Sequence, residues 1–264
     1  MAAIPQTWHY GLIARWWAEF NVGGEEIPYL SDLILQEGGR ALDVGCGTGR
    51  VLVPLMEAGL DVDGADLSPD MLEYCRGSAE RAGYTPLIKA QPTHELDMGR
   101  EYPVVYSCGA FALGGDRQQD IEGLRRCREH LQPGGVFVFD SELPNHEHFN
   151  WLLGAGTAPL EEPWPTEGTR KRTADGTDLE LICRTVDCNA FEATRTLAMR
   201  VNHTRDGKLL AKEEHTLKLT LYLRNEILLM LQHVGFGDVE VRGGWSDRAP
   251  VAGEDGNLLY VARN

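Results

Sequence analysis

The sequence predicts an α/β protein with a doubly wound parallel sheet and an inserted antiparallel β segment. Apolar, strand-like runs alternate with helical patterns between residues 40 and 140, which is typical of βαβ units. From residue 143, a stretch with prolines and glycines leads to runs of alternating polarity, predicted as strands over 179–187, 193–204 and 208–221. The α/β pattern resumes after residue 221, so the β segment is an insertion into the sheet domain.

The parallel part of the sheet contains five predicted strands, over 40–44, 60–65, 86–90, 102–108 and 136–140. A helix over 50–58 follows the first strand and places its apolar residues on one side. The next helix begins after Ser68, which can cap it, with Pro69 at its first position. A further helix over 117–131 precedes the last of these strands.

The rest of the chain completes the predicted organisation. An aromatic-rich helix is expected near the N-terminus, and Asp206-Gly207 indicates a β-hairpin inside the insertion. A helix over 224–233 and strands over 237–242 and 258–262 close the sheet. The predicted domains are an N-terminal helical lid (1–39), a core (40–142 and 222–264) and an inserted β lid or acceptor segment (143–221).

Composition disfavours several classes of function. The formal charge of -15 would repel a phosphate backbone, so nucleic acids and anionic membranes are not expected as partners. The six cysteines form no C-x-x-C pair, which indicates neither a zinc cage nor a disulfide framework. No signal peptide and no run of 18 apolar residues is found, so we expect a cytoplasmic protein.

A glycine-rich turn between the first strand and its helix indicates a ligand site. Gly45, Gly47 and Gly49 lack Cβ atoms, so the backbone can approach a ligand closely at the carboxyl edge of the sheet. The dinucleotide fingerprint G-x-G-x-x-G requires glycine at position 50, where this chain has Arg50. This departure weakens the NAD interpretation.

Two carboxylates flank the glycine turn. Asp43 precedes it, where a negative charge would oppose a pyrophosphate but suits a ligand that carries an ammonium or sulfonium cation. Asp66 ends the second strand about 20 residues further on, where a carboxylate can accept hydrogen bonds from ribose hydroxyls. The first charge favours S-adenosylmethionine over NAD, while the second suits both cofactors.

Three segments in this order resemble the class I S-adenosylmethionine-dependent methyltransferases of the small-molecule type. They are ALDVGCGTGR at 41–50, VDGADLSPDML at 62–72 and LQPGGVF at 131–137. The resemblance covers residues 40–140, and the elements after residue 221 fit the family's ending. It implies a seven-stranded Rossmann-like methyltransferase sheet and S-adenosylmethionine as the cofactor.

The resemblance also implies a set of cofactor-binding residues: Tyr10, Arg15, Asp43, Gly45, Cys46, Gly47, Gly49, Asp66, Leu67, Gln91 and Cys108. The glycines would approach the methionine part, and Asp43 would orient its charged end. Asp66 and Leu67 would hold ribose and adenine. Gln91 stands where the family often has an acidic residue that accepts from the adenine amino group. Tyr10 and Arg15 belong to an N-terminal helix that resembles a lid, although its aromatics also suit simple core packing.

Candidates for a catalytic base follow the fifth strand. His146 and His148 lie just beyond a strand end that faces the cofactor in this fold, with Glu142 nearby. A histidine near its working pH would help a hydroxyl acceptor, whereas an amine acceptor only has to lose its ammonium proton. The alternative is that these residues cap the irregular segment. No third ligand accompanies the two histidines, so we predict no metal site.

The sequence thus predicts a methyltransferase acting on a small-molecule acceptor by in-line N- or O-methylation. The Asn-Pro-Pro-Tyr and Asp-Pro-Pro-Tyr motifs of nucleic-acid amino methylation are absent after the fourth strand, which continues as Ser107-Cys108-Gly109. The alternatives are a non-catalytic S-adenosylmethionine-binding protein and an NAD-dependent oxidoreductase. The acceptor and the oligomeric state are left open.

Overall fold

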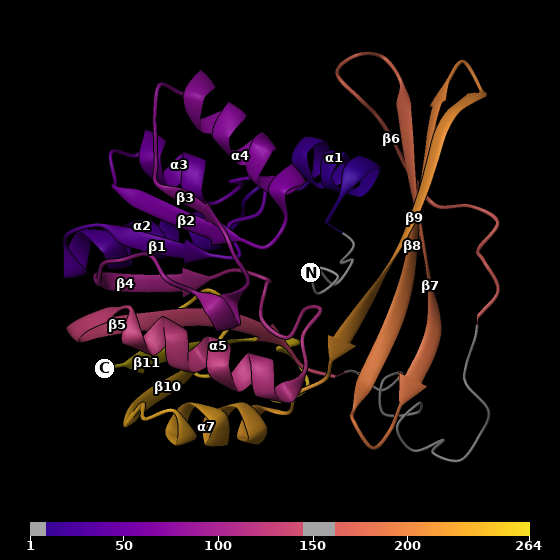
Figure 1. The fold of residues 1–264 in the computed structure, drawn as a ribbon. Coiled ribbons are helices and arrows are strands. Elements are labelled where there is room, and N and C mark those ends of the chain that lie inside the picture. Colours follow the sequence, from indigo (N-terminus) through magenta and orange to yellow (C-terminus); the bar gives the residue numbers. More distant parts are fainter. Residues whose placement is uncertain (1–8, 145–161) are drawn as a thin grey trace. The chain divides into compact units, whose positions relative to one another are not determined.

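A seven-stranded mixed sheet forms the centre of the larger of two units in the computed structural model, which describes residues 9–144 and 162–264 (Figure 1). This core unit comprises Val22–Ala112, Asp116–Asn145 and Tyr222–Asn264. Its strand order is β10-β11-β5-β4-β1-β2-β3. The strands are β1 (Ala41–Val44), β2 (Val62–Asp66), β3 (Ile88–Ala90), β4 (Tyr102–Ser107), β5 (Leu131–Glu142), β10 (Asp238–Gly243) and β11 (Asn257–Arg263).

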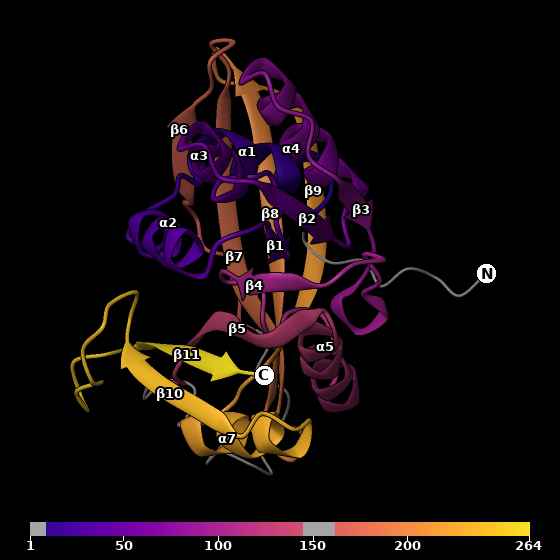
Figure 2. The same ribbon diagram turned by 90° about the vertical axis from the view of Figure 1, so that its left-hand side faces the viewer.

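Strands β1 to β5 run parallel to one another, and β11 pairs with both β5 and β10 in antiparallel fashion. Helices cover both faces of the sheet, as Figures 1 and 2 show. They are α2 (Glu26–Glu37), α3 (Leu52–Glu57), α4 (Pro69–Arg81), α5 (Arg117–Glu129) and α7 (Arg224–His233), with a short 3₁₀ helix η1 (Thr93–Glu95). The doubly wound Rossmann-like prediction is confirmed.

Two hydrophobic clusters, one on each face, hold this unit together. Leu124 of α5 and Leu231 of α7 pack against Phe139 of the sheet on one face. On the other face, Leu30 of α2 and Leu52 of α3 belong to the second cluster. Burial of each such side chain stabilises the fold by about 1.5–3 kcal/mol. Because both faces are covered, the central strands read as near-continuous apolar runs, which is the pattern that made them predictable.

The helix starts follow from local sequence. Ser68 Oγ accepts a hydrogen bond from Met71 N at 3.2 Å, and Pro69 occupies the first helical position of α4, as predicted. Asp116 and Gln119 form a capping box at α5. Helix α5 ends at Glu129, two residues before the predicted end, and β5 begins at Leu131 with a register shift against β4.

The insertion unit comprises Met1–Asn21, Leu113–Gly115 and His146–Leu221. Its antiparallel sheet has the order β6-β7-β8-β9, with β6 (Thr169–Arg172), β7 (Asp178–Asn189), β8 (Thr194–Arg205) and β9 (Lys208–Thr220). Strand β6 was not predicted, because all four of its residues are exposed and it shows no polarity alternation. Both residues of the predicted Asp206-Gly207 turn have positive φ, as a type I′ hairpin requires.

The N-terminal segment divides between the two units. Helix α1 (Gly11–Phe20) packs on the antiparallel sheet, where Ile13 and Trp16 contact a cluster with Leu179, Met199 and Val201. Helix α2 packs in the core unit instead. The predicted 1–39 segment is therefore two helices with different partners, and its role as a lid stays a prediction.

Candidate functional site

The predicted cofactor residues of the core unit gather at one edge of its sheet. Strands β3, β2, β1 and β4 are adjacent and parallel, so their carboxyl ends meet at the same edge. The residues at or just beyond these ends are Asp43, Gly45, Cys46, Gly47, Gly49, Asp66, Leu67, Gln91 and Cys108. The fold thus brings together nine positions from four segments. Whether each contacts the cofactor stays a prediction.

The glycine turn has a backbone that side chains rarely tolerate. Gly45, Gly47 and Gly49 have φ values of 80°, 52° and 83°. The amides of Gly45 and Cys46 both donate to the carbonyl of Ala65, at 2.7 and 3.0 Å, which ties the turn to the end of β2. A Cβ on Gly47 would meet only the Met71 side chain at 3.1 Å and one backbone oxygen at 4.0 Å. A Cβ at Gly45, Gly47 or Gly49 would meet neighbouring side chains at 2.3, 3.1 and 2.9 Å, so the turn needs glycine at all three positions.

Asp66 holds the glycine turn through backbone hydrogen bonds. Its Oδ2 accepts from Gly47 N at 2.9 Å, and its Oδ1 accepts from Ser68 N at 2.8 Å. Burial raises the pKa of this carboxyl, and the backbone amides of Ser68 and Gly47 act in the opposite direction. The sequence argument assigned Asp66 to ribose alone and missed that it also holds the glycine turn.

Asp43 is a buried carboxyl with a raised pKa. Its side chain is buried, with a residue exposure of 2%. Burial raises its pKa to about 7, and the positive charge of Arg50 opposes that rise. Arg50 itself is paired with Glu26. Burial disfavours the ionised form of this carboxyl in the free protein, and a cation bound beside it would stabilise that form.

The remaining core-unit positions make contacts of their own. Gln91 Oε1 accepts from Asp97 N at 3.3 Å, and its Nε2 lies 3.3 Å from the Met98 sulfur. An adenine amino group would therefore use the second lone pair of this oxygen. Cys46 is buried, and Cys108 is half-buried at the end of β4. Burial raises the pKa of the Cys108 thiol well above its usual range, so it is neutral at physiological pH.

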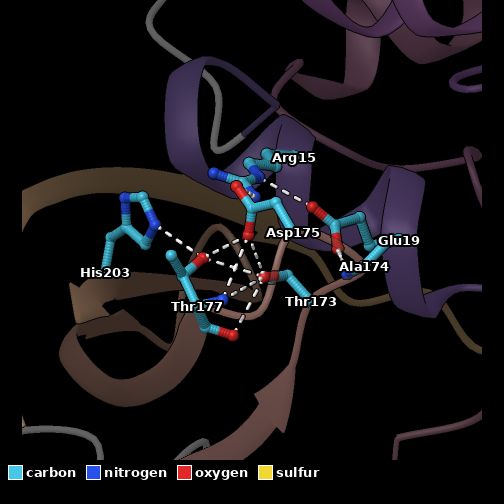
Figure 3. A network of polar contacts seen from close by, with 7 residues as sticks. All are labelled: Arg15, Glu19, Thr173, Ala174, Asp175, Thr177 and His203. Carbon is cyan, nitrogen blue, oxygen red and sulfur yellow. Dashed lines mark hydrogen bonds and ion pairs between the residues drawn. The ribbon is translucent and has the colours of Figure 1, made fainter. Parts of the chain in front are cut away.

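Tyr10 and Arg15 lie in the insertion unit. Tyr10 precedes helix α1, and Arg15 donates to Glu19 Oε1 at 2.7 Å and to Asp175 Oδ2 at 3.1 Å (Figure 3). Thr173 and Thr177 donate their hydroxyls to the other oxygen of Asp175, at 2.6 and 2.7 Å. Contact of Tyr10 and Arg15 with a cofactor stays a prediction. A cofactor contact by Arg15 would add to its ion pairs with Glu19 and Asp175.

The catalytic candidates His146 and His148 lie outside the described residues. Among the described residues, no helix is long and apolar enough to span a membrane, and no group of three metal-ligating side chains is found. A contact that sequence reasoning missed is made by Asp140 at the end of β5, whose Oδ1 accepts from Gly109 N at 2.7 Å.

The residues present fit S-adenosylmethionine. Two carboxylates lie at the glycine turn: Asp43 is buried in β1 just before it, and Asp66 accepts from its central amide. These two acceptors suit a ligand with a cationic centre and free hydroxyls, and they oppose a pyrophosphate. Positive φ and close neighbours keep the turn free of side chains, so its backbone would approach a ligand with no side chain between them.

Comparison with known proteins identifies the family of the chain. The methyltransferase domain family matches residues 41–135. An uncharacterized methyltransferase of Synechocystis sp. is 32% identical over 166 residues, covering 58% of this chain and 73% of the relative. A ubiquinone biosynthesis O-methyltransferase of Cereibacter sphaeroides is 32% identical over 43% of this chain, but the match spans only 45% of that relative.

Solved structures match over nearly the whole chain. The CcbJ methyltransferase of Streptomyces caelestis has a TM-score of 0.69, with 22% identity and 98% of both chains covered. The sugar N-methyltransferase KedS8 of Streptoalloteichus sp. has a TM-score of 0.65, with 20% identity and coverage of 91% and 88%. A sheet with these motifs at its carboxyl edge defines a class I methyltransferase fold. The chain belongs to the S-adenosylmethionine-dependent methyltransferases.

Proposed function

We propose that this enzyme methylates an amine nitrogen of a small, sugar-like metabolite. The observation that carries the proposal is the inserted antiparallel sheet with helix α1, because a match over 91% of the chain includes this unit as well as the core. The matched protein is described as a sugar N-methyltransferase. The charge of -15 also favours a cationic amine over an anionic acceptor.

The chain's own groups at the sheet edge would bind and orient the cofactor. S-adenosylmethionine supplies an electrophilic methyl group on a sulfonium centre. Asp66 would accept from the ribose hydroxyls while it holds Gly47, and ionised Asp43 would attract the cationic end. Orientation of a nucleophile in line can supply up to ~7–11 kcal/mol of the barrier reduction, so a dedicated base is not required for an amine.

The acceptor would be selected by the insertion unit. This part of the proposal is supported by chain connectivity, since the inserted segment leaves the core after β5 and returns before α7. Residues 1–39 and 143–221 keep their predicted role as lid and acceptor segments, with His146 and His148 as candidate contacts. The cytoplasmic location likewise stays a prediction.

Release of S-adenosylhomocysteine tests the proposal. The enzyme is assayed with matched pairs of acceptors, an amino sugar and the same sugar with a hydroxyl in place of the amine. We expect product only from the amine member, with the methyl group on nitrogen by mass spectrometry. Product from the hydroxyl member alone would establish O-methylation, which is the activity in the name of the Cereibacter relative. No product from either member would reject the acceptor class.

A further inference from the structure

The loop that follows β4 is held in a strained conformation. Gly109 and Ala112 both have a φ of 67°, and Ala112 is a buried residue whose side chain disfavours this region. Such a backbone persists only where surrounding contacts hold it in place. The residues over 108–112, which we call the β4 loop, therefore need anchors.

One anchor is the carboxylate of Asp140. Ser107, the last residue of β4, pairs in register with Phe139, so Asp140, the next residue of β5, lies beside the start of the β4 loop. Asp140 Oδ1 accepts from Gly109 N at 2.7 Å. Its Oδ2 accepts from Asn257 Nδ2 of β11 at 2.9 Å. Each oxygen of Asp140 accepts a hydrogen bond, so this carboxylate acts as a clamp that joins the β4 loop to β11 and is not a free base.

A second anchor is the ring of Phe111. Its centroid lies 4.9 Å from that of Phe139 and 5.3 Å from that of Tyr222, and both partners are buried in the core unit. These contacts fix the far end of the β4 loop. The near end, at Gly109, depends on Asp140.

The β4 loop lies directly against the glycine turn. A Cβ placed on Gly45 would stand 2.3 Å from the Cβ of Ala110, which is well inside any allowed contact. The Ala110 methyl group therefore occupies the space beside the first glycine of the turn. A shift of Gly109 would move Ala110 and remove the support of Gly45.

We propose that Asp140 is a positioning residue for the methionine half of the cofactor. It acts through the chain Asp140, Gly109, Ala110 and Gly45, and it does not touch the reacting atoms. The adenosine half is predicted to depend instead on Asp66, at the end of a different strand. This inference rests on S-adenosylmethionine being the cofactor, and it is independent of which acceptor is methylated.

Binding calorimetry with S-adenosylmethionine, S-adenosylhomocysteine and adenosine tests the proposal on the full chain. Asp140→Ala should weaken binding of both methionine-bearing ligands by about tenfold, since a hydrogen bond to a charged group is lost. Adenosine should bind with unchanged affinity. Asp116→Ala is the control, because it also removes an aspartate-to-amide hydrogen bond, the 2.9 Å N-cap bond to Gln119 N of α5, but this bond involves neither Gly109 nor the glycine turn.

Asp140→Asn should restore affinity for S-adenosylmethionine to within about threefold of the wild type, because an amide oxygen can still accept from Gly109 N. The Asn257 amide can rotate to suit the introduced amide, as its oxygen is buried without a hydrogen-bond partner among the described residues. If Asp140→Ala does not fold, Asn257→Ala serves in its place, since it releases one side of the clamp. A smaller loss confined to the methionine-bearing ligands is then expected.

Three results would overturn the inference. Equal loss of adenosine binding in the folded alanine variant would show a general structural effect. Unchanged affinity for all three ligands would remove Asp140 from the site. An asparagine variant as impaired as the alanine variant would show that the hydrogen bond to Gly109 is not what matters. Each of these outcomes leaves the identity of the acceptor untouched.

Discussion

Replacing Asp43 with asparagine should change how stability depends on pH. Asp43 is buried, and its pKa is raised from 3.8 to about 7, mainly by burial. The folded chain therefore keeps a proton on this group up to about pH 7, while the unfolded chain loses it near pH 4. Because the folded state binds more protons in this interval, stability falls as the pH rises through it.

The magnitude follows from the shift. A shift of about three units in the pKa of Asp43 corresponds to about 4 kcal/mol in the free energy of unfolding. This full difference is reached only above the pKa of the folded state. Between pH 5 and pH 8, the wild-type free energy of unfolding should fall by about 2.6 kcal/mol relative to Asp43→Asn, which cannot ionise. The native carboxylate thus costs stability at neutral pH, and a bound cation would offset that cost.

Urea unfolding of both proteins at pH 5, 6, 7 and 8, without cofactor, measures this difference. Asp238→Asn is the control, since Asp238 is exposed at the start of β10. We expect the wild type and the Asp43 variant to diverge steadily, while the control follows the wild type. Parallel pH profiles for wild type and Asp43→Asn would refute the burial argument.

Three other variants test the site and the acceptor side. Asp66→Ala should weaken S-adenosylmethionine binding by about 1.5–3 kcal/mol in calorimetry, because ribose loses a charged acceptor and Gly47 N loses its partner; unchanged affinity in a folded variant would reject this. Gly47→Val should abolish binding through steric conflict and a φ of 52°, and retained affinity would show that the turn does not approach the ligand. If His146 or His148 is a base, its alanine variant should lose about 10²- to 10⁴-fold in turnover and recover partly at higher pH; unchanged turnover in both would leave orientation as the catalytic device.

The core fold was predictable because its signals are local. The apolar runs around β1 and β4 reflect strands covered on both faces, and Ser68 with Pro69 marks the start of α4. The glycine turn was predictable for the same reason, since positive φ at Gly45 requires that residue type. These features depend on a few neighbouring residues.

Features that depend on distant residues were not predictable. Strand β6 has four exposed residues, and only its pairing with β7 makes it a strand. The ion pair between Arg15 and Asp175 joins residues 160 apart in sequence. The bond between Asp140 and Gly109 likewise requires knowledge that β4 and β5 are neighbours in register. A carboxylate that ends a strand beside a glycine-containing loop is the signal that could have suggested it.

Calorimetric titration of the full chain with S-adenosylmethionine and with NAD tests the central claim most directly, which is that two carboxylates at the glycine turn select a cationic nucleoside cofactor. The account predicts saturable, one-to-one binding of S-adenosylmethionine that is weakened in Asp66→Ala and Asp43→Asn, with no binding of NAD in the same range. Binding of NAD, or binding of S-adenosylmethionine that neither substitution changes, would contradict it.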